Sequence, residues 1–315
     1  MTTVRNSDRA GGSSAPDVSV VVIFKDAEDF LEEAVESVFA QSFDAWELVL
    51  VDDGSSDRST AVARRWAAEN GSHVRYLEHA GHANRGMSAS RNLGLAHAAG
   101  EFVGFLDADD ALVSGALAEQ VSILRAHPRV GMVYGPLEYW YGWTGLPEDK
   151  ERDFVHPTGV STDRIYEPPE LIALFIQNIA FAPSGMLLHR ELVERVGGFE
   201  ESFRDLYEDQ VFAAKICRST PVYISGRSWY RYRQHERSCC LVAQRDGRLD
   251  ASRRPFLEWL VGYLEREGLA GEDAWQLATS ELRRWSPRGR FVASLGRTRR
   301  FARELATRFG GGTLG

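Results

Sequence analysis

Three aspartates directly follow a short apolar segment of the chain. The segment Phe102–Leu106 is followed by Asp107, Ala108, Asp109 and Asp110. Carboxylates at the end of a buried strand are costly unless a cation binds or pairs with them. Asp107 and Asp109, two residues apart, offer the oxygen ligands that a hard divalent ion prefers. We therefore predict a metal site whose open coordination positions are filled by phosphate oxygens, as in an enzyme that acts on a metal–nucleotide complex.

A second pair of carboxylates, Asp52 and Asp53, follows another apolar run and precedes Gly54 and Ser55. A carboxylate there can accept hydrogen bonds from a nucleobase or a ribose. The same residues can instead form a turn and cap the next helix. The motif alone favours neither interpretation.

A glycine bend at Gly86 leads into a segment of small side chains that carries Arg91. Small side chains let a helix approach a ligand closely, and an arginine can bind phosphate through paired hydrogen bonds. A tightly packed helix with a surface arginine explains the same residues, and it is the favoured interpretation of this segment taken alone.

Two later segments add acidic and basic groups. Glu208 and Asp209 stand at the start of an expected helix, where carboxylates are stabilised, although one could take a proton from an attacking hydroxyl. Arg233 and Arg237 could contact phosphate, and His235 could contact a metal or a diphosphate. A lone histidine is more often structural.

Alternating strands and helices position these groups. Buried strands are predicted at Val18–Phe24, Trp46–Val51, His73–Glu78 and Phe102–Leu106, with helices at Ala27–Gln41, Asp57–Asn70 and Met87–Ala98 between them. This alternation indicates a parallel sheet, which binds ligands beyond the carboxyl ends of its strands. Lys25-Asp26, Asp52-Asp53 and the Asp107–Asp110 segment should therefore lie along one edge.

The pattern changes after a predicted helix at Ala116–His127. We expect a strand at Val130–Tyr141 and a long loop at Thr144–Pro169. Further elements are expected as helices at Glu170–Gln177, Glu208–Cys217, Pro255–Glu267 and Asp273–Trp285, and as strands at Gly185–His189, Val222–Ser225 and Ser228–Arg233. An aromatic cluster could stack on an acceptor or simply belong to the core; its members are Tyr139, Trp140, Tyr141 and Trp143.

Taken in order, the motifs resemble those of the family 2 glycosyltransferases of the GT-A fold. They read VDDGS, NRGxSxSRNxG, FLDADD, GGFEESF with ED after four further residues, and YRxH, and they extend from about Val18 to Ser238. The resemblance implies an α/β protein with a Rossmann-like mixed, mostly parallel sheet flanked by helices. It divides the chain into a disordered tail (1–16), a GT-A domain (17–240) and a C-terminal helical extension (241–315).

The resemblance also implies roles for individual residues in an inverting transfer from a nucleotide-sugar donor. Asp53 would read the base, Asp107 would lie near the ribose, and Asp109 would hold Mn²⁺ or Mg²⁺ on the diphosphate. Asp209 would be the catalytic base, with Glu208 beside it. The remaining residues that we assign to donor binding are Phe24, Lys25, Asp26, Arg91, Ala108, Arg233 and His235.

Two departures from the family pattern bear on specificity. Phe24-Lys25-Asp26 stands where many members have an aromatic residue and then asparagine, so Phe24 is one position early for stacking on a base and Lys25 brings charge instead. The Q-x-x-R-W signature of processive members is absent, which favours transfer of one sugar per encounter. A UDP-sugar is the favoured donor, and the expected acceptor is a saccharide or a lipid-linked molecule in cell-surface polysaccharide or glycoconjugate assembly.

Composition fits a cytoplasmic enzyme. The 315 residues are 43% hydrophobic, enough for a substantial core, and the three cysteines suggest a reducing compartment. We see neither a signal peptide nor an apolar run long enough to span a membrane. The net charge is −8, yet residues 282–309 hold nine arginines against one acidic residue. A basic amphipathic helix near Phe291–Phe309 could lie on an anionic membrane surface, or it could be an ordinary solvated helix.

Other functions remain as alternatives. Sugar-phosphate nucleotidyltransferases also combine such a sheet with metal-binding aspartates, but they have a glycine-rich basic loop after the first strand, and residues 24–28 contain no glycine. A non-catalytic carbohydrate- or membrane-binding protein is the other alternative, against which the intact acidic set argues. The chain outside residues 282–309 is acidic and has no recognised nucleic-acid-binding module, which argues against binding of nucleic acid.

Overall fold

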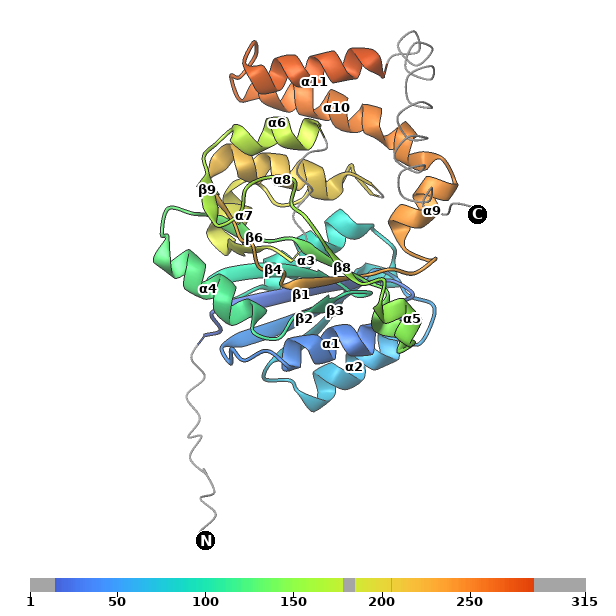
Figure 1. Cartoon of the computed structure of the whole chain (residues 1–315). Helices are drawn as coiled ribbons and strands as arrows, with labels where there is room; N and C mark the ends of the chain where they lie inside the picture. Colours follow the sequence, from blue (N-terminus) through green and yellow to red (C-terminus); the bar gives the residue numbers. More distant parts are fainter. Residues whose placement is uncertain (1–14, 178–184, 205, 286–315) are drawn as a thin grey trace, which may run out of the picture.

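The computed structural model describes residues 15–177, 185–204 and 206–285 (Figure 1). Its centre is an eight-stranded sheet in the order β3-β2-β1-β4-β10-β6-β11-β9. These strands are β1 (Val18–Phe24), β2 (Trp46–Asp52), β3 (Val74–Glu78), β4 (Phe102–Asp107), β6 (Met132–Tyr134), β9 (Arg164–Tyr166), β10 (Leu187–His189) and β11 (Val222–Ile224). The predicted α/β class and the mixed, mostly parallel sheet are confirmed.

The first four strands form the regular half of the sheet. β1 pairs in parallel with β2 and β4, and β2 pairs in parallel with β3. All residues of β1 and β2 are buried, as expected for strands covered on both faces. The other half is mixed, because β10 runs antiparallel to β4 and β6, and β9 runs antiparallel to β11.

Each face of the sheet has its own apolar core. One face packs on α1 (Leu31–Phe39), α2 (Ser59–Glu69) and α4 (Ala116–Ala126). The other packs on α3 (Met87–His97), α6 (Glu170–Ile176), α7 (Arg190–Arg195) and α8 (Glu208–Ser219). Figure 1 shows these layers, with α1 and α2 below the sheet and α6 and α8 above it.

A second, four-stranded sheet lies beside the carboxyl end of β4. It has the order β5-β12-β7-β8, formed by β5 (Ala111–Leu112), β12 (Tyr230–Arg233), β7 (Leu137–Trp140) and β8 (Phe154–His156). The expected single strand at Val130–Tyr141 is therefore wrong: β6 and β7 belong to different sheets. The chain breaks at Gly135, where an added Cβ would lie 2.1 Å from the carbonyl oxygen of Arg227.

The long loop expected at Thr144–Pro169 is also wrong. The segment from residue 142 contains the 3₁₀ turn η2 (Gly142–Thr144), the short helix α5 (Pro147–Lys150), β8 and β9. Each is only three or four residues long. Elements this short are held by pairing with distant strands, and their own sequences carry little periodic signal.

The chain continues into α9 (Cys239–Arg245), α10 (Arg248–Arg266) and α11 (Asp273–Arg284). α10 and α11 lie over α6 and α8 (Figure 1), and Phe256 and Leu260 join the same apolar core as β1. The predicted tail, apart from residues 15 and 16, and the predicted basic helix near Phe291–Phe309 lie outside the described residues. In the part of the chain that is described, no helix is both long and apolar enough to cross a membrane.

Candidate active site

The strand ends meet at one edge of the main sheet, as predicted. Strand register places Phe24 beside Asp52, and Ile23 beside Asp107. The residues that follow β1, β2 and β4 therefore project from the same edge. This edge brings together Lys25 and Asp26, Asp52 and Asp53, and the Asp107–Asp110 turn.

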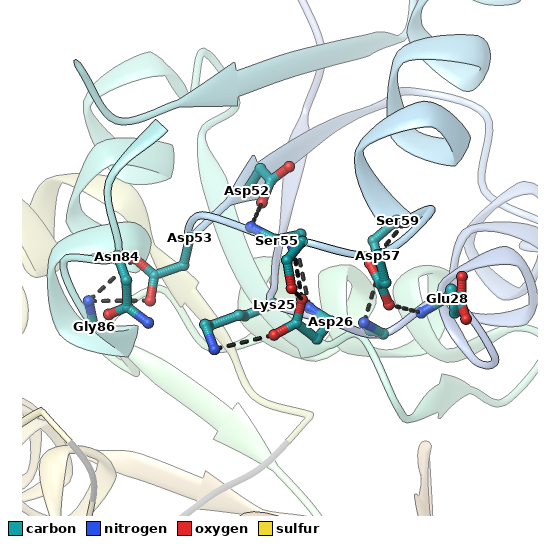
Figure 2. A network of polar contacts seen from close by, with 12 residues as sticks. Lys25, Asp26, Glu28, Asp52, Asp53, Ser55, Asp57, Ser59, Asn84 and Gly86 are labelled. Atoms are coloured by element: carbon teal, nitrogen blue, oxygen red, sulfur yellow. Dashed lines mark hydrogen bonds and ion pairs between the residues drawn. The ribbon is translucent and has the colours of Figure 1, made fainter. Parts of the chain in front are cut away.

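Asp53 is buried in a cradle of backbone amides. Its Oδ1 accepts hydrogen bonds from the backbone N–H groups of Arg85 (2.6 Å) and Gly86 (3.1 Å), as Figure 2 shows for Gly86. Nε2 of His79 lies 3.8 Å away. The Asn84–Gly86 bend thus fixes the carboxylate. The sequence indicated the bend itself but not that its amides bind Asp53.

The neighbouring carboxylates build the turns of this edge (Figure 2). Asp52 is fully buried and accepts hydrogen bonds from the Ser55 N–H (2.8 Å) and the Thr60 hydroxyl (2.5 Å). Asp26, which adopts a φ of 51°, accepts one from the Ser56 N–H at 2.7 Å. That bond lowers the pKa of Asp26. Lys25 is exposed and pairs with Asp26 at 3.1 Å.

Arg91 joins the edge of the sheet to the start of α8. Its guanidinium donates to Oδ1 of Asp107 at 2.8 Å and to Oε1 of Glu208 at 3.1 Å. The side chain is 8% exposed and packs over the ring of Phe199. The sequence suggested a surface arginine or a phosphate contact, whereas the structure shows a buried cation shared by two carboxylates.

Glu208 and Asp209 differ in accessibility although they are adjacent. Glu208 is buried and paired with Arg91, while Asp209 is partly exposed and accepts a hydrogen bond from the Gln210 N–H at 2.8 Å. Burial raises the pKa of both carboxyls above their usual values, and the nearby Asp209 carboxylate raises the pKa of Glu208 further. Asp209 is thus the more available proton acceptor, because Glu208 is buried and paired with Arg91.

His235 contacts the second aspartate of the DxD sequence. Its Nε2 lies 3.0 Å from Oδ2 of Asp109, and its ring packs on Phe30 with centroids 4.6 Å apart. The imidazole is 7% exposed, and its buried Nδ1 has no hydrogen-bond partner. The structure therefore joins two predicted site residues that are 126 positions apart.

Arg233 is buried beneath the same turn. Its Nε donates to the Asp109 carbonyl oxygen at 2.6 Å, and its Nη2 donates to Glu33 at 2.7 Å. Its guanidinium also packs against the rings of Trp140 and Trp143. These contacts make Arg233 a support for the Asp109 turn rather than a free phosphate ligand, a role that the sequence did not reveal because Glu33 lies 200 positions away.

Two other predicted donor-binding residues are also buried. Phe24 is 3% exposed and packs in the apolar core on the α1 side of the sheet, so its ring is not offered for stacking on a base. Ala108 is 5% exposed.

Asp110, the third aspartate of the turn, is buried and accepts a hydrogen bond from the backbone N–H of Arg233 at 2.8 Å. Burial raises its pKa well above the usual range.

The residues around Asp109 provide some, but not all, of the ligands that a divalent ion needs. Asp109 supplies carboxylate oxygen and His235 supplies imidazole nitrogen, while the Asp107 carboxylate is 42% exposed and already bonded to Arg91. Among the residues that the structure describes, no three His, Cys, Asp or Glu side chains are grouped as a ready metal cage. The coordination shell of a metal bound here would be completed by ligands from the substrate.

Comparison with known families decides the assignment. The sequence matches the profile "Glycosyl transferase family 2" over residues 19–197, more than half of the chain. The chain belongs to this family. As a family 2 glycosyltransferase, it is a transferase enzyme, and the matched region contains every predicted site residue of the strand edge up to Asp110.

Relatives cover different shares of this glycosyltransferase. The "Uncharacterized glycosyltransferase EpsJ" of Bacillus subtilis is 26% identical over 262 residues, 81% of this chain and 72% of EpsJ. The "O-antigen biosynthesis protein RfbC" of Myxococcus xanthus is 28% identical over 264 residues, 82% of this chain but 19% of RfbC. Another curated relative is matched over only 41% of its length.

Solved structures of GT-A glycosyltransferases share the fold. Staphylococcus aureus TarS 1–349, solved with UDP-GlcNAc, has a TM-score of 0.58 and 18% identity, with 86% of this chain and 82% of TarS covered. The mannosyltransferase PcManGT from Pyrobaculum calidifontis, solved with GDP-Man and Mn²⁺, has a TM-score of 0.57 and 21% identity, with 96% and 77% covered.

Proposed function

We propose that this family 2 glycosyltransferase moves a single sugar from a UDP-sugar to a hydroxyl acceptor, with inversion at the anomeric carbon. One observation carries the proposal: Arg91 links the DxD turn to the acidic pair, with bonds to both Asp107 and Glu208. The turn that would hold a donor diphosphate and the acidic pair that would accept a proton are thus both bonded to one side chain. Both are required for direct displacement of a nucleotide.

The donor would lie along the edge formed by β1, β2 and β4. Asp53 is the predicted base-reading residue, and Asp107 the predicted ribose contact. Asp109 with His235 would hold Mn²⁺ or Mg²⁺, which neutralises charge on the diphosphate as it leaves. Carboxylate and imidazole ligands together suit Mn²⁺ at least as well as Mg²⁺.

The chain's own groups would carry the remaining chemistry. Asp209 takes the proton from the acceptor hydroxyl, whose oxygen forms a bond to the anomeric carbon as the bond to the diphosphate oxygen breaks. Glu208 stays paired with Arg91 and does not contact the acceptor. This ion pair fixes the start of α8, where Asp209 lies. Proton transfer of this kind typically contributes about 10²–10⁴-fold to the rate.

The donor and acceptor classes are supported by indirect observations. Relatives include a protein named for O-antigen biosynthesis, and TarS was solved with UDP-GlcNAc. The absence of Q-x-x-R-W in the sequence favours single transfers over polymerisation. A saccharide or lipid-linked acceptor in cell-surface polysaccharide or glycoconjugate assembly, a cytoplasmic location and peripheral contact with an anionic membrane remain part of this proposal.

A panel of nucleotide sugars tests the function. The chain is incubated with UDP-, GDP- and dTDP-sugars and Mn²⁺ or Mg²⁺, and the released nucleotide and free sugar are measured. We expect UDP release that is abolished by EDTA. Release of pyrophosphate from a nucleoside triphosphate and a sugar 1-phosphate would instead indicate a nucleotidyltransferase. No turnover of any donor would support a non-catalytic binding protein.

A further inference from the structure

Three aromatic side chains form a row across the second sheet. Tyr232 on β12 is paired in register with Tyr139 on β7, and Tyr139 is paired with Phe154 on β8. Residues paired in this way lie side by side on one face. The ring centroids are 5.3 Å apart between Tyr232 and Tyr139, and 5.1 Å apart between Tyr139 and Phe154. We call these three residues the aromatic row.

The aromatic row begins near the edge of the main sheet that carries the Asp107–Asp110 turn. Tyr230, on the same face of β12 as Tyr232, accepts a hydrogen bond from the backbone N–H of Asp107 at 3.2 Å. The far end of the row is the outer strand of the sheet, where Phe154 is 44% exposed. The row therefore leads from the DxD turn to the surface.

The opposite face of this sheet is already occupied. On that face Arg233 packs against the rings of its paired neighbour Trp140 and of Phe30, beneath the Asp109 turn. A structural core would account for those side chains, but it does not account for an exposed Phe154. Its ring is nearly parallel to that of Tyr139, with an interplanar angle of 25°. His156, two residues along β8, also packs on Tyr139.

We propose that the aromatic row binds the saccharide acceptor of the proposed transferase, with the sugar that receives the new linkage at the Tyr232 end and the next sugar over Tyr139 and Phe154. The proposal rests on the proposed function, since it deepens the acceptor side of that site. Sugar rings present weakly positive C–H groups on one face, and these are attracted to the negative face of an aromatic ring. Strands lie about 4.8 Å apart. Tyr139 and Phe154, whose rings are inclined by 25°, form the part of the row for the second sugar, while the Tyr232 ring stands edge to face with Tyr139 at 82° and borders the first.

A saccharide fits the aromatic row better than a lipid chain does. Tyr139 and Tyr232 carry hydroxyls at their ring edges, which can pair with sugar hydroxyls. The exposed aliphatic side chain beside Phe154, Val155, follows it on β8 and lies on the other face. A lipid chain would gain nothing from these polar groups. It also could not contact Val155 from the face that carries the aromatic row.

The test compares variants at neighbouring positions of β8. Four disaccharides serve as probes (cellobiose, lactose, maltose and N,N′-diacetylchitobiose), and binding is measured by saturation-transfer NMR. Phe154→Ala and Phe154→Leu should weaken binding of at least one probe by roughly three- to ten-fold, the loss expected for one aromatic stack. Phe154→Tyr keeps the ring, and Val155→Ala is the matched control, because Val155 is also exposed (53%) but lies on the opposite face. Both should bind as wild type.

Failure of this inference can be told apart from failure of the proposed function. Release of UDP from the UDP-sugar panel in the presence of Mn²⁺ is measured on the same variants and should stay within about two-fold of wild type. Unchanged UDP release together with no saturation transfer to any of the four probes would overturn the inference alone. So would full binding by Phe154→Leu, which would make the contact merely apolar and favour a lipid chain. Absence of UDP release from the wild type would overturn the proposed function.

Discussion

The guanidinium of Arg91 lies 3.1 Å from Oε1 of Glu208, although 117 residues separate them in the chain. Both side chains are 8% exposed. An ion pair this buried contributes little net stability, because the cost of removing both charges from water offsets much of their attraction. It contributes more by fixing the relative positions of the two side chains. Its consequence is positional: through Arg91, the start of helix α8, which carries Glu208 and Asp209, is held beside Asp107 at the edge of the sheet.

Removal of Arg91 should leave a buried carboxylate without its partner. Arg91→Met is expected to destabilise the fold by about 3–5 kcal/mol, and Arg91→Met with Glu208→Met should recover much of that loss. Arg227→Met is the matched control, since Arg227 forms an ion pair with Glu119 but is 72% exposed; it should cost less than about 1 kcal/mol. Urea denaturation measures all three, and a double variant no more stable than the single one would contradict the buried pairing.

Asp209→Asn should remove the proton acceptor while keeping the shape of the side chain. We expect UDP release and sugar transfer to fall by about 10²–10⁴-fold, with UDP affinity unchanged. Glu208→Gln, the neighbouring change, should be less damaging, because Glu208 is committed to Arg91. Near-normal transfer by a folded Asp209→Asn protein would show that another group accepts the proton.

The pH profile tests whether a buried carboxylate is the base. A base must be ionised, and burial raises the pKa of Asp209 above its usual 3.8. The ratio kcat/KM should therefore be level at alkaline pH and fall about tenfold per unit as the pH drops below that raised pKa. Burial raises the pKa of Glu208 as well, so the same profile is measured on Glu208→Gln, where the fall should persist if Asp209 is the base. A profile that falls only at the usual pKa of an exposed aspartate, with circular dichroism unchanged, would exclude both assignments.

Gly54 is required where the chain leaves β2. Its φ is +79°, and an added Cβ would lie 2.9 Å from both the Asn84 nitrogen and the His82 oxygen. Gly54→Ala should therefore cost more than about 1 kcal/mol, and it should weaken UDP binding by displacing the bend that holds Asp53. Gly145→Ala is the control: its φ is +76° but no atom lies within 4 Å of the added Cβ. Equal melting temperatures of the two variants would refute a role for close packing at Gly54.

The regular half of the fold could be predicted from the sequence. Val18–Phe24 is a run of apolar, mostly β-branched residues that only a doubly covered strand explains, and the polar residues after it mark the carboxyl end. The alternation with amphipathic helices then places these ends along one edge. The strand positions of β1, β2 and β4 agree with the prediction to within one residue.

The second sheet could not be predicted in the same way. β5 has only two residues, β8 has three, and their pairing depends on partners far away in the chain. The same limit applies to the site. From the sequence we predicted that Arg233 contacts phosphate, but only the fold shows that Glu33 and the Asp109 carbonyl oxygen bind its guanidinium.

The most direct test of the central claim is the affinity for UDP with and without metal. The carboxylates at the edge of the sheet are tolerable beside a diphosphate only if a divalent cation lies between them. Calorimetry should show UDP binding to the wild type with Mn²⁺, loss of that binding with EDTA, and loss of the metal-dependent part in Asp109→Ala. Equal UDP affinity of wild type and Asp109→Ala, with and without Mn²⁺, would contradict the account.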